Sequence, residues 1–220
     1  FGTSLAVAAI YGSGTPDQMV EWVPQCFGTV DEPAVAAFCT TEPEAGSDLA
    51  NMKTKAVPIE DEDGTVTGYR ISGAKQWISN GTIADATTIL ALAPGGPTWF
   101  VVEKDSPGFT MGQKMRGIGW RGLDTRELYF DDVWVPDEHL VGDPEMGLGQ
   151  LTRTLEMGRI SIAALSLRLT HAGHRREPPL LPLRALRHRV PRHQHRRDAV
   201  DQRRTGHRPP GRAGQFAGRF

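Results

Sequence analysis

The 220-residue sequence contains only two cysteines, no long apolar run and no initiator methionine. Cys26 and Cys39 are separated by 12 residues without a CxxC spacing, which favours two buried free thiols in a reducing compartment, although one disulfide is geometrically possible. Because no apolar run reaches about 18 residues, no membrane span is indicated. The chain starts at Phe1 and enters an apolar run at Leu5 without the charged-then-apolar order of a signal peptide. We therefore expect a fragment whose upstream part is missing.

Acidic residues dominate the first three quarters of the chain, and arginine dominates the rest. Residues 1–170 carry 12 basic and 23 acidic side chains, a net charge of −11, whereas residues 171–220 carry 13 arginines, no lysine and 3 acids, a net charge of +10. This asymmetry excludes one uniform domain. Residues 171–220 also hold 6 histidines and 6 prolines, so a long helix is excluded there and disorder is expected from composition.

The order of helical and strand patterns predicts an α+β fold. Residues 3–10 and a segment that begins at Thr15-Pro16 have helical signals, and residues 145–170 return to a wide apolar helical stripe. Between them lie short strand-like segments separated by turn residues, one of them (53–59) alternating, and this spacing predicts an antiparallel barrel or sandwich. The expected strands cover residues 36–41, 53–59, 66–72, 75–79, 87–93, 98–103 and 126–135.

Two motifs suggest other functions but lack the context that those functions need. Residues 117–122 match GxGxxG, yet a strand-like run follows where a dinucleotide site needs a helix, so a glycine-rich connection between strands is the better interpretation. His188, His193 and His195 have arginine neighbours that would repel a metal cation, so no metal site is predicted. The same basic segment could attract nucleic-acid phosphates, but it has almost no aromatic residues for base stacking, and a solvated charge run is favoured.

Four blocks, in order, resemble the acyl-CoA dehydrogenase family over roughly residues 5–170. The most informative is FCTTEPEAGSD at 38–48, a loop after a strand that can present N–H and O–H groups to a phosphate or a polar ring edge. On the residues alone, a plain turn with an Asp cap is about as consistent. The other blocks are GAKQWISNG at 73–81, DTREL at 124–128 with DVWVP at 132–136, and TLEMGRI at 154–160.

The resemblance implies a multidomain architecture. Residues 1–34 would end an N-terminal helical domain, residues 35–143 would form a middle β-domain that binds flavin and acyl-CoA, and residues 144–172 would be the first helix of a C-terminal helical domain. Residues 173–220 would be an arginine-, proline- and histidine-rich tail. In intact family members the resemblance implies a homo-oligomer, a tetramer. The resemblance also implies that the protein works in the cytoplasm, or in the mitochondrial matrix of a eukaryote, and that neither nucleic acid nor a membrane is its partner.

The resemblance also implies the reaction, an FAD-dependent α,β-dehydrogenation of an acyl-CoA thioester. A Glu carboxylate would remove the α-proton while the β-hydrogen leaves as hydride to the flavin, with the thioester carbonyl polarised by fixed hydrogen bonds. The electrons would pass to an electron-transferring flavoprotein. An acyl-CoA oxidase-like relative that uses oxygen is the alternative.

By motif position the resemblance assigns binding residues. The FAD contacts, through backbone and hydroxyl groups, would come from Phe38, Cys39, Thr40, Thr41, Gly46 and Ser47, with Trp77, Ile78 and Ser79 covering the flavin. The acyl-CoA contacts would come from Ser47, Glu156 and Arg159. On the residues alone, Glu156 and Arg159 fit an i, i+3 surface pair on a helix equally well.

The sequence departs from the family pattern at four places. Glu44 replaces the usual Gly and puts a negative charge near a pyrophosphate, and Asn51 replaces a small residue. Nothing after about residue 170 matches, and Gly158 occupies the position where some branches carry the base, so no catalytic residue is assigned. We therefore expect a catalytically incomplete chain, and we hypothesise that the abrupt loss of pattern after Ala172-Gly173 marks out-of-frame translation.

Overall fold

The structure is a computed structural model that describes residues 2–176. Contacts within the chain group the residues up to Arg168 into one unit, and the packing described below concerns that unit. Of the second unit, the structure describes only the end of a helix, residues 169–176. The disorder expected from residue 171 onward is wrong for residues 171–176, which continue the helix because the first proline that would end it is Pro178. From position 177 onward, the predictions of disorder and of an out-of-frame origin lie outside the described residues.

Two helices begin the chain, α1 (Gly2–Ser13) and α2 (Pro16–Phe27). The Thr15 side chain accepts a hydrogen bond from the Gln18 N–H at 3.2 Å, and the Gln18 side chain accepts one from the Thr15 N–H at 3.0 Å. This reciprocal capping box satisfies two amide donors that a helix start leaves without partners. The predicted helix start at Thr15 is therefore confirmed.

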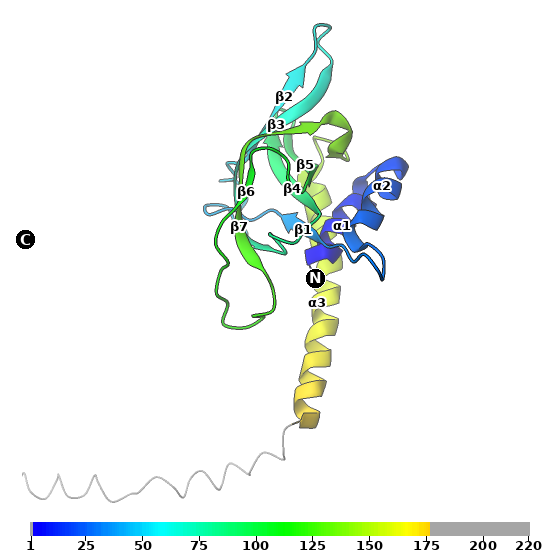
Figure 1. Cartoon of the computed structure of the whole chain (residues 1–220), viewed down its shortest axis with the longest axis vertical. Coiled ribbons are helices and arrows are strands. Elements are labelled where there is room, and N and C mark those ends of the chain that lie inside the picture. The colour runs from blue at the N-terminus through cyan, green and yellow to red at the C-terminus, as the bar shows by residue number, and fades with distance from the viewer. Residues whose placement is uncertain (1, 177–220) are drawn as a thin grey trace, which may run out of the picture. The chain divides into compact units, whose positions relative to one another are not determined.

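A mixed β-sheet follows the two helices. Its strands, apart from β1, lie in the order β6-β7-β3-β2-β4-β5-β8, and β1 pairs with β4 (Figure 1). Most neighbouring strands are antiparallel, as predicted, but β1 and β2 each pair with β4 in parallel. The strands are β1 (Ala36–Cys39), β2 (Lys55–Glu60), β3 (Val66–Ser79), β4 (Ala86–Ala93), β5 (Gly96–Glu103), β6 (Phe109–Met111), β7 (Thr125–Pro136) and β8 (Leu140–Val141).

The departures from the strand prediction have physical reasons. Parallel pairing of β1 with β4 needs a crossover connection, which the intervening β2–β3 pair supplies. The two segments expected at 66–72 and 75–79 form one strand, β3, because bulges against β7 carry the chain across the interruption. The short strands β6 and β8 and the 3-10 turn η1 (Asp137–His139) were not predicted. The GxGxxG match lies in the connection between β6 and β7, so that interpretation is confirmed.

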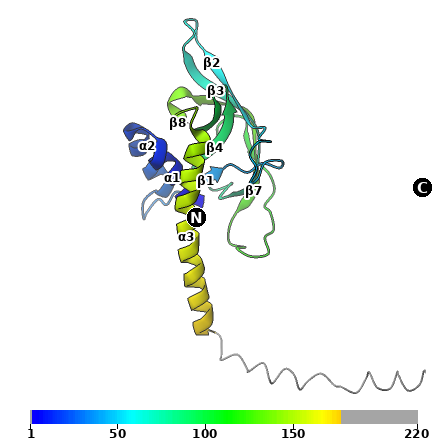
Figure 2. The same cartoon turned by 180° about the vertical axis from the view of Figure 1, so that it is seen from behind.

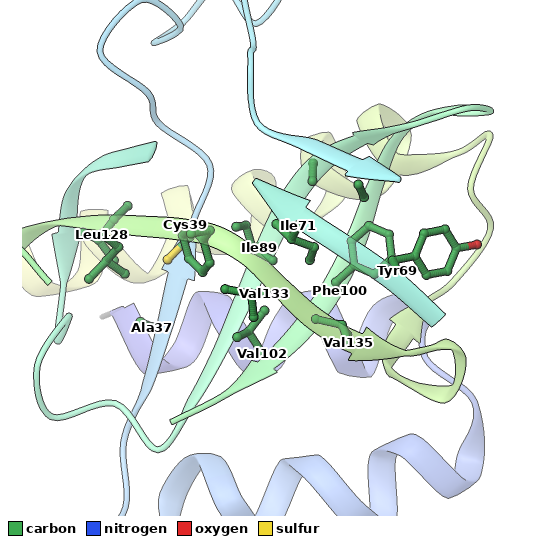
Figure 3. Close-up of a cluster of buried hydrophobic side chains, with 14 of the residues drawn as sticks. Ala37, Cys39, Tyr69, Ile71, Ile89, Phe100, Val102, Leu128, Val133 and Val135 are labelled. Carbon is green, nitrogen blue, oxygen red and sulfur yellow. The ribbon is translucent and has the colours of Figure 1, made fainter. Parts of the chain in front are cut away.

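One hydrophobic cluster fills the space that the strands enclose (Figure 3). Figure 3 shows side chains from β1, β3, β4, β5 and β7 pointing toward one another, with Ile89 and Phe100 fully buried. Since side chains alternate along a strand, Ile89 and Ala91 of β4 face this cluster while Leu90 between them faces the other way. Both faces of β4 and β5 are therefore buried, which explains their nearly continuous apolar runs.

A second cluster joins the other face of the sheet to the helices. Ala6, Ile10 and Trp22 of α1 and α2 meet Leu90 there, and Leu151 of helix α3 (Gly147–Arg176) packs against the same cluster. Figures 1 and 2 show α1, α2 and the first part of α3 on one side of the sheet. The helix–sheet–helix order confirms the predicted α+β class.

Helix α3 begins in close contact with β5. The Trp99 indole N–H donates a hydrogen bond to the Gly147 carbonyl at 3.1 Å. A side chain at position 147 would overlap the Pro97 carbonyl oxygen, so only glycine allows this approach. Within residues 2–176, none of the helices is long and apolar enough to cross a membrane.

Candidate functional site

A cavity of about 880 Å³ lies where the loop after β1 meets the end of the sheet and the first turns of α3. It brings together four of the residues predicted to bind FAD, Thr40, Thr41, Gly46 and Ser47. Its volume is within the range of small-molecule and cofactor sites, about 300–1,000 Å³. The other lining residues are Asp48, Leu49, Ala50, Leu92, Pro97, Leu148, Leu151, Thr152 and Leu155.

The cavity lining has two chemical characters. The loop contributes hydroxyl groups and main chain, and β4 and α3 contribute leucines. No atom lies within 4 Å of the place where a side chain on Gly46 would begin, so a ligand can approach the main chain there. An amphipathic cofactor or thioester needs this combination, because it carries polar edges on an apolar body. The residues present therefore fit the polar edge and the apolar body of a flavin or acyl-CoA.

Trp77 stands at a bulge in β3 and points away from the core. The register between β3 and β7 shifts between Lys75 and Ile78, and Trp77 has a φ of 63°. As a result Trp77 is 59% exposed whereas Ile78 is only 3% exposed. Such a left-handed conformation is unfavourable for a large side chain and is found mostly where function over-determines the backbone.

Trp77 lines a second cavity, of about 670 Å³, formed with the connection between β6 and β7. The backbone links the two cavities, since the Gln76 N–H donates to the Thr41 carbonyl at 2.8 Å. The 38–48 and 73–81 blocks, which are about 35 residues apart in sequence, are therefore side by side in the structure. That proximity is what a common cofactor site requires.

Four of the predicted FAD residues lie outside both cavities. The Phe38 ring stacks on Trp99 with centroids 5.1 Å apart, and Ser79 is half-buried at the end of β3. The side chains of Cys39 and Ile78 point into the first hydrophobic cluster, so only their main chain can meet a ligand. Both cysteines of the chain are free and buried, which confirms the thiol prediction.

Glu156 and Arg159 are exposed on α3, beyond the part that lines the first cavity. Residues three and four apart share a helix face, so both lie about one turn further along the side that carries Thr152 and Leu155. Among the ion pairs of residues 2–176, none joins Glu156 to Arg159. Substrate contact and an exposed i, i+3 pair therefore both stay predictions for these two residues.

A buried ion pair supports the loop and was missed by the sequence reasoning. Lys75 Nζ donates to Glu42 Oε1 at 2.8 Å and to the Thr40 carbonyl at 3.2 Å. The two side chains are only 0% and 3% exposed. The sequence did contain a sign of this pair, because Lys75 is the one charged residue in the strand segment 71–79.

The environment of this pair shifts both pKa values. Burial acts to raise the pKa of Glu42, but hydrogen bonds from Lys75, Thr54 and the Lys53 backbone outweigh it, so the pKa lies below its ordinary value of 4.5. Burial lowers the pKa of Lys75 below its ordinary value, although the Glu42 carboxylate opposes that shift. The two side chains are held together at 2.8 Å, shielded from water.

The negative charge of Glu44, which stands where the family usually has glycine, is paired with a lysine at the surface. Its carboxylate forms an ion pair with Lys53, and both side chains are more than half exposed. The extra negative charge in the loop is therefore partly neutralised within the loop itself. In the described part of the chain, no group of three or more His, Cys, Asp or Glu could hold a metal ion.

The β-sheet region matches a known protein family. Residues 37–133 match the family model described as the acyl-CoA dehydrogenase middle domain. Over 177 residues the chain is 35% identical to a probable medium-chain specific acyl-CoA dehydrogenase 2, mitochondrial, of Caenorhabditis briggsae, covering 77% of this chain and 41% of the relative. These matches place the chain among the flavin-dependent oxidoreductases, and the blocks at 38–48, 73–81 and 124–128 lie inside the matched middle domain.

Solved structures give the same result. Butyryl-CoA dehydrogenase from Megasphaera elsdenii has a TM-score of 0.65 at 35% identity, covering 73% of this chain and 41% of that chain. An acyl-CoA dehydrogenase complexed with FAD from Bacillus anthracis has a TM-score of 0.60 at 31% identity, covering 70% and 26%. The chain belongs to the acyl-CoA dehydrogenase family. It spans about two fifths of the length of the Caenorhabditis briggsae relative (41%).

Proposed function

We propose that this chain is part of an enzyme that removes two hydrogens from Cα and Cβ of an acyl-CoA thioester with FAD as cofactor. The observation that carries the proposal is the cavity at the end of β1, where hydroxyl groups and open main chain face leucines of β4 and α3. It is supported by the family membership and by a relative of known structure that is complexed with FAD. The cofactor, when bound, supplies a two-electron acceptor.

The loop residues have the binding roles in this proposal. Thr40, Thr41, Gly46 and Ser47 would hold the cofactor through hydroxyl and main-chain groups, and Ser47 would also face the CoA portion of the substrate. Fixed donors of this kind stabilise charge without reorganising during the reaction. The leucines would exclude water from the reacting carbons. Glu156 and Arg159, further along α3, would contact the substrate's polar end.

The proton-accepting group is not among the residues that line the cavity. Asp48 is the only titratable residue in the lining, and it is exposed, with its carboxylate accepting a hydrogen bond from the Ala50 N–H at 2.9 Å. A base for an α-proton needs an apolar surrounding that raises its pKa. We therefore assign no catalytic residue within 2–176 and place the base elsewhere in the enzyme.

The proposal extends to the domains and the partners. Residues 1–34, 35–143 and 144–172 would be the end of an N-terminal helical domain, the middle domain and the first helix of a C-terminal domain, with residues 173–220 as a separate tail. The electrons would pass to an electron-transferring flavoprotein, and the intact enzyme would be a homo-oligomer. It would work in the cytoplasm, or in the mitochondrial matrix of a eukaryote.

The proposal predicts that the chain alone binds FAD weakly, and that it reduces bound FAD slowly because the cavity lining contains no base. The measurement is anaerobic addition of acyl-CoA to the FAD-loaded chain, followed by absorbance near 450 nm, roughly the flavin band. Little bleaching is expected. Rapid and complete bleaching would show that a base is present and contradict the assignment. Peroxide formed in air would point to the oxidase-like alternative.

A further inference from the structure

We propose that the buried Glu42–Lys75 pair is a positioning device for the cofactor segment, and that it contributes little to the stability of the fold. The inference rests on the proposed function, because the segment it positions is the loop assigned to FAD. Neither residue touches the ligand cavities, so both would act through the residues they hold.

The pair holds the loop at its base. Lys75 Nζ, from β3, bonds both the Glu42 carboxylate and the Thr40 carbonyl. The carboxylate in turn accepts the backbone N–H groups of Lys53 at 2.6 Å and Thr54 at 3.2 Å. Three segments of chain therefore meet at the carboxylate of Glu42, the residue that follows the cavity-lining Thr41.

The backbone of Glu42 sets the following turn. Its N–H donates to the Ala45 carbonyl at 2.8 Å, and its carbonyl accepts the Ala45 N–H at 3.2 Å. Gly46 and Ser47 come immediately after this turn and line the cavity. Fixing Glu42 thus fixes the course of the loop from Thr41 to Ser47.

The same pair reaches the wall that carries Trp77. Lys75 is the last residue before the bulge that turns Trp77 outward, and the Gln76 N–H between them donates to the Thr41 carbonyl. Movement of Lys75 would therefore shift both the loop and the bulge. A single buried contact couples the two parts of the site.

The backbone of β3 lies close to the segment that donates to Glu42. Gly73, two residues before Lys75, has a φ of 155°, and a side chain there would lie 2.5 Å from Thr54 Oγ1. Glycine at this position allows β3 to approach the segment that donates to Glu42. The close approach keeps Lys75 within reach of its partner.

Stability does not explain why such a pair would be kept. Removing two charges from water costs about as much as their attraction returns, and well-packed uncharged replacements are often neutral or stabilising. An ion pair does, however, demand one geometry, which suits a loop that must present several groups to one ligand. Stabilising the fold and positioning the loop can therefore be distinguished by experiment.

The test is the double variant Glu42→Gln with Lys75→Met, which removes both charges and keeps the side-chain sizes similar. The control is Arg70→Met with Asp132→Asn, which removes an exposed ion pair between β3 and β7 that lines neither cavity. Three quantities are compared with the unmodified chain. They are the urea midpoint, the hydrogen exchange of the Glu42, Ala45 and Gln76 amides, and the FAD dissociation constant with the circular dichroism of the bound flavin.

We expect the double variant to keep its urea midpoint and to lose hydrogen-exchange protection at the three amides. It should also bind FAD about tenfold more weakly, a loss of the size that is typical when a residue orienting the binding groups is removed. The flavin dichroism should change as well, and the control should match the unmodified chain. Unchanged exchange and affinity would overturn the inference. A lowered midpoint with parallel loss of protection throughout the sheet would also overturn it, since the pair would then stabilise the fold. If the unmodified chain binds no FAD, the proposed function fails while the exchange data still decide the inference.

Discussion

Removal of Lys75 alone is expected to destabilise the fold strongly. Lys75→Met leaves the Glu42 carboxylate, 3% exposed, without its cation. An unpaired buried charge costs about 3–5 kcal/mol. The Lys53 and Thr54 N–H groups still donate to that carboxylate, so the lower end, about 3 kcal/mol, is expected. A domain of this size is stable by about 5–15 kcal/mol, so the loss is easily measured.

The loss should depend on pH in a defined direction. In the unmodified chain the pKa of Glu42 is lowered, so its contribution to stability is present above 4.5 and disappears as the pH falls through the folded-state value. In Lys75→Met, burial raises the pKa of Glu42, so the penalty is present at high pH and disappears as the carboxylate takes up a proton. The difference between the two proteins should therefore shrink on acidification.

The assay is urea unfolding at about pH 7 and about pH 5, with the Glu42→Gln, Lys75→Met double variant alongside. The double variant should recover most of the loss, because no charge remains buried. The reasoning is refuted if the single and double variants are equally unstable, or if the single variant's deficit does not change with pH.

Two further predictions concern the core and the thiols. Ile89→Ala, in the cluster between the strands, should lower the free energy of unfolding by about 2–5 kcal/mol. Val57→Ala, at an exposed position, should change it by less than about 0.5 kcal/mol. Similar urea midpoints for the two variants would contradict the described core. Burial raises the pKa of the Cys26 thiol to about 11 and raises the pKa of the Cys39 thiol further. Neither thiol should therefore react with a thiol reagent in the native protein at about pH 8, whereas both should react in urea. Rapid labelling of the native protein would be inconsistent with their burial.

Local signals made much of the fold predictable. Thr15 with Gln18 three residues later is a capping box in the sequence and in the structure. Alternation at residues 53–59 predicted β2, because a strand that buries one face repeats its apolar residues at every second position. The turn at residues 94–97 separated the two segments that became β4 and β5, and the structure explains their nearly continuous apolar runs by burial on both faces.

Features that depend on contacts distant in sequence were not predictable. The parallel pairing of β1 with β4 and the short strands β6 and β8 exist only once their partners are in place. The bulge at Trp77 needs the register of β7, and the Glu42–Lys75 pair joins residues that are 33 positions apart. The family motifs contained all three residues, but their physical roles emerged from the packing.

Equilibrium binding of FAD tests the central claim most directly, that the loop at 40–47 is a cofactor-binding surface. The comparison is between the unmodified chain, the variant Thr41→Val with Ser47→Ala, and the control Thr110→Val, which is exposed on β6 outside the cavity. We expect a dissociation constant of about 10–100 µM for the unmodified chain and the control, and a value about tenfold higher for the loop variant. Equal affinity in all three proteins, or no binding to any, would contradict the claim.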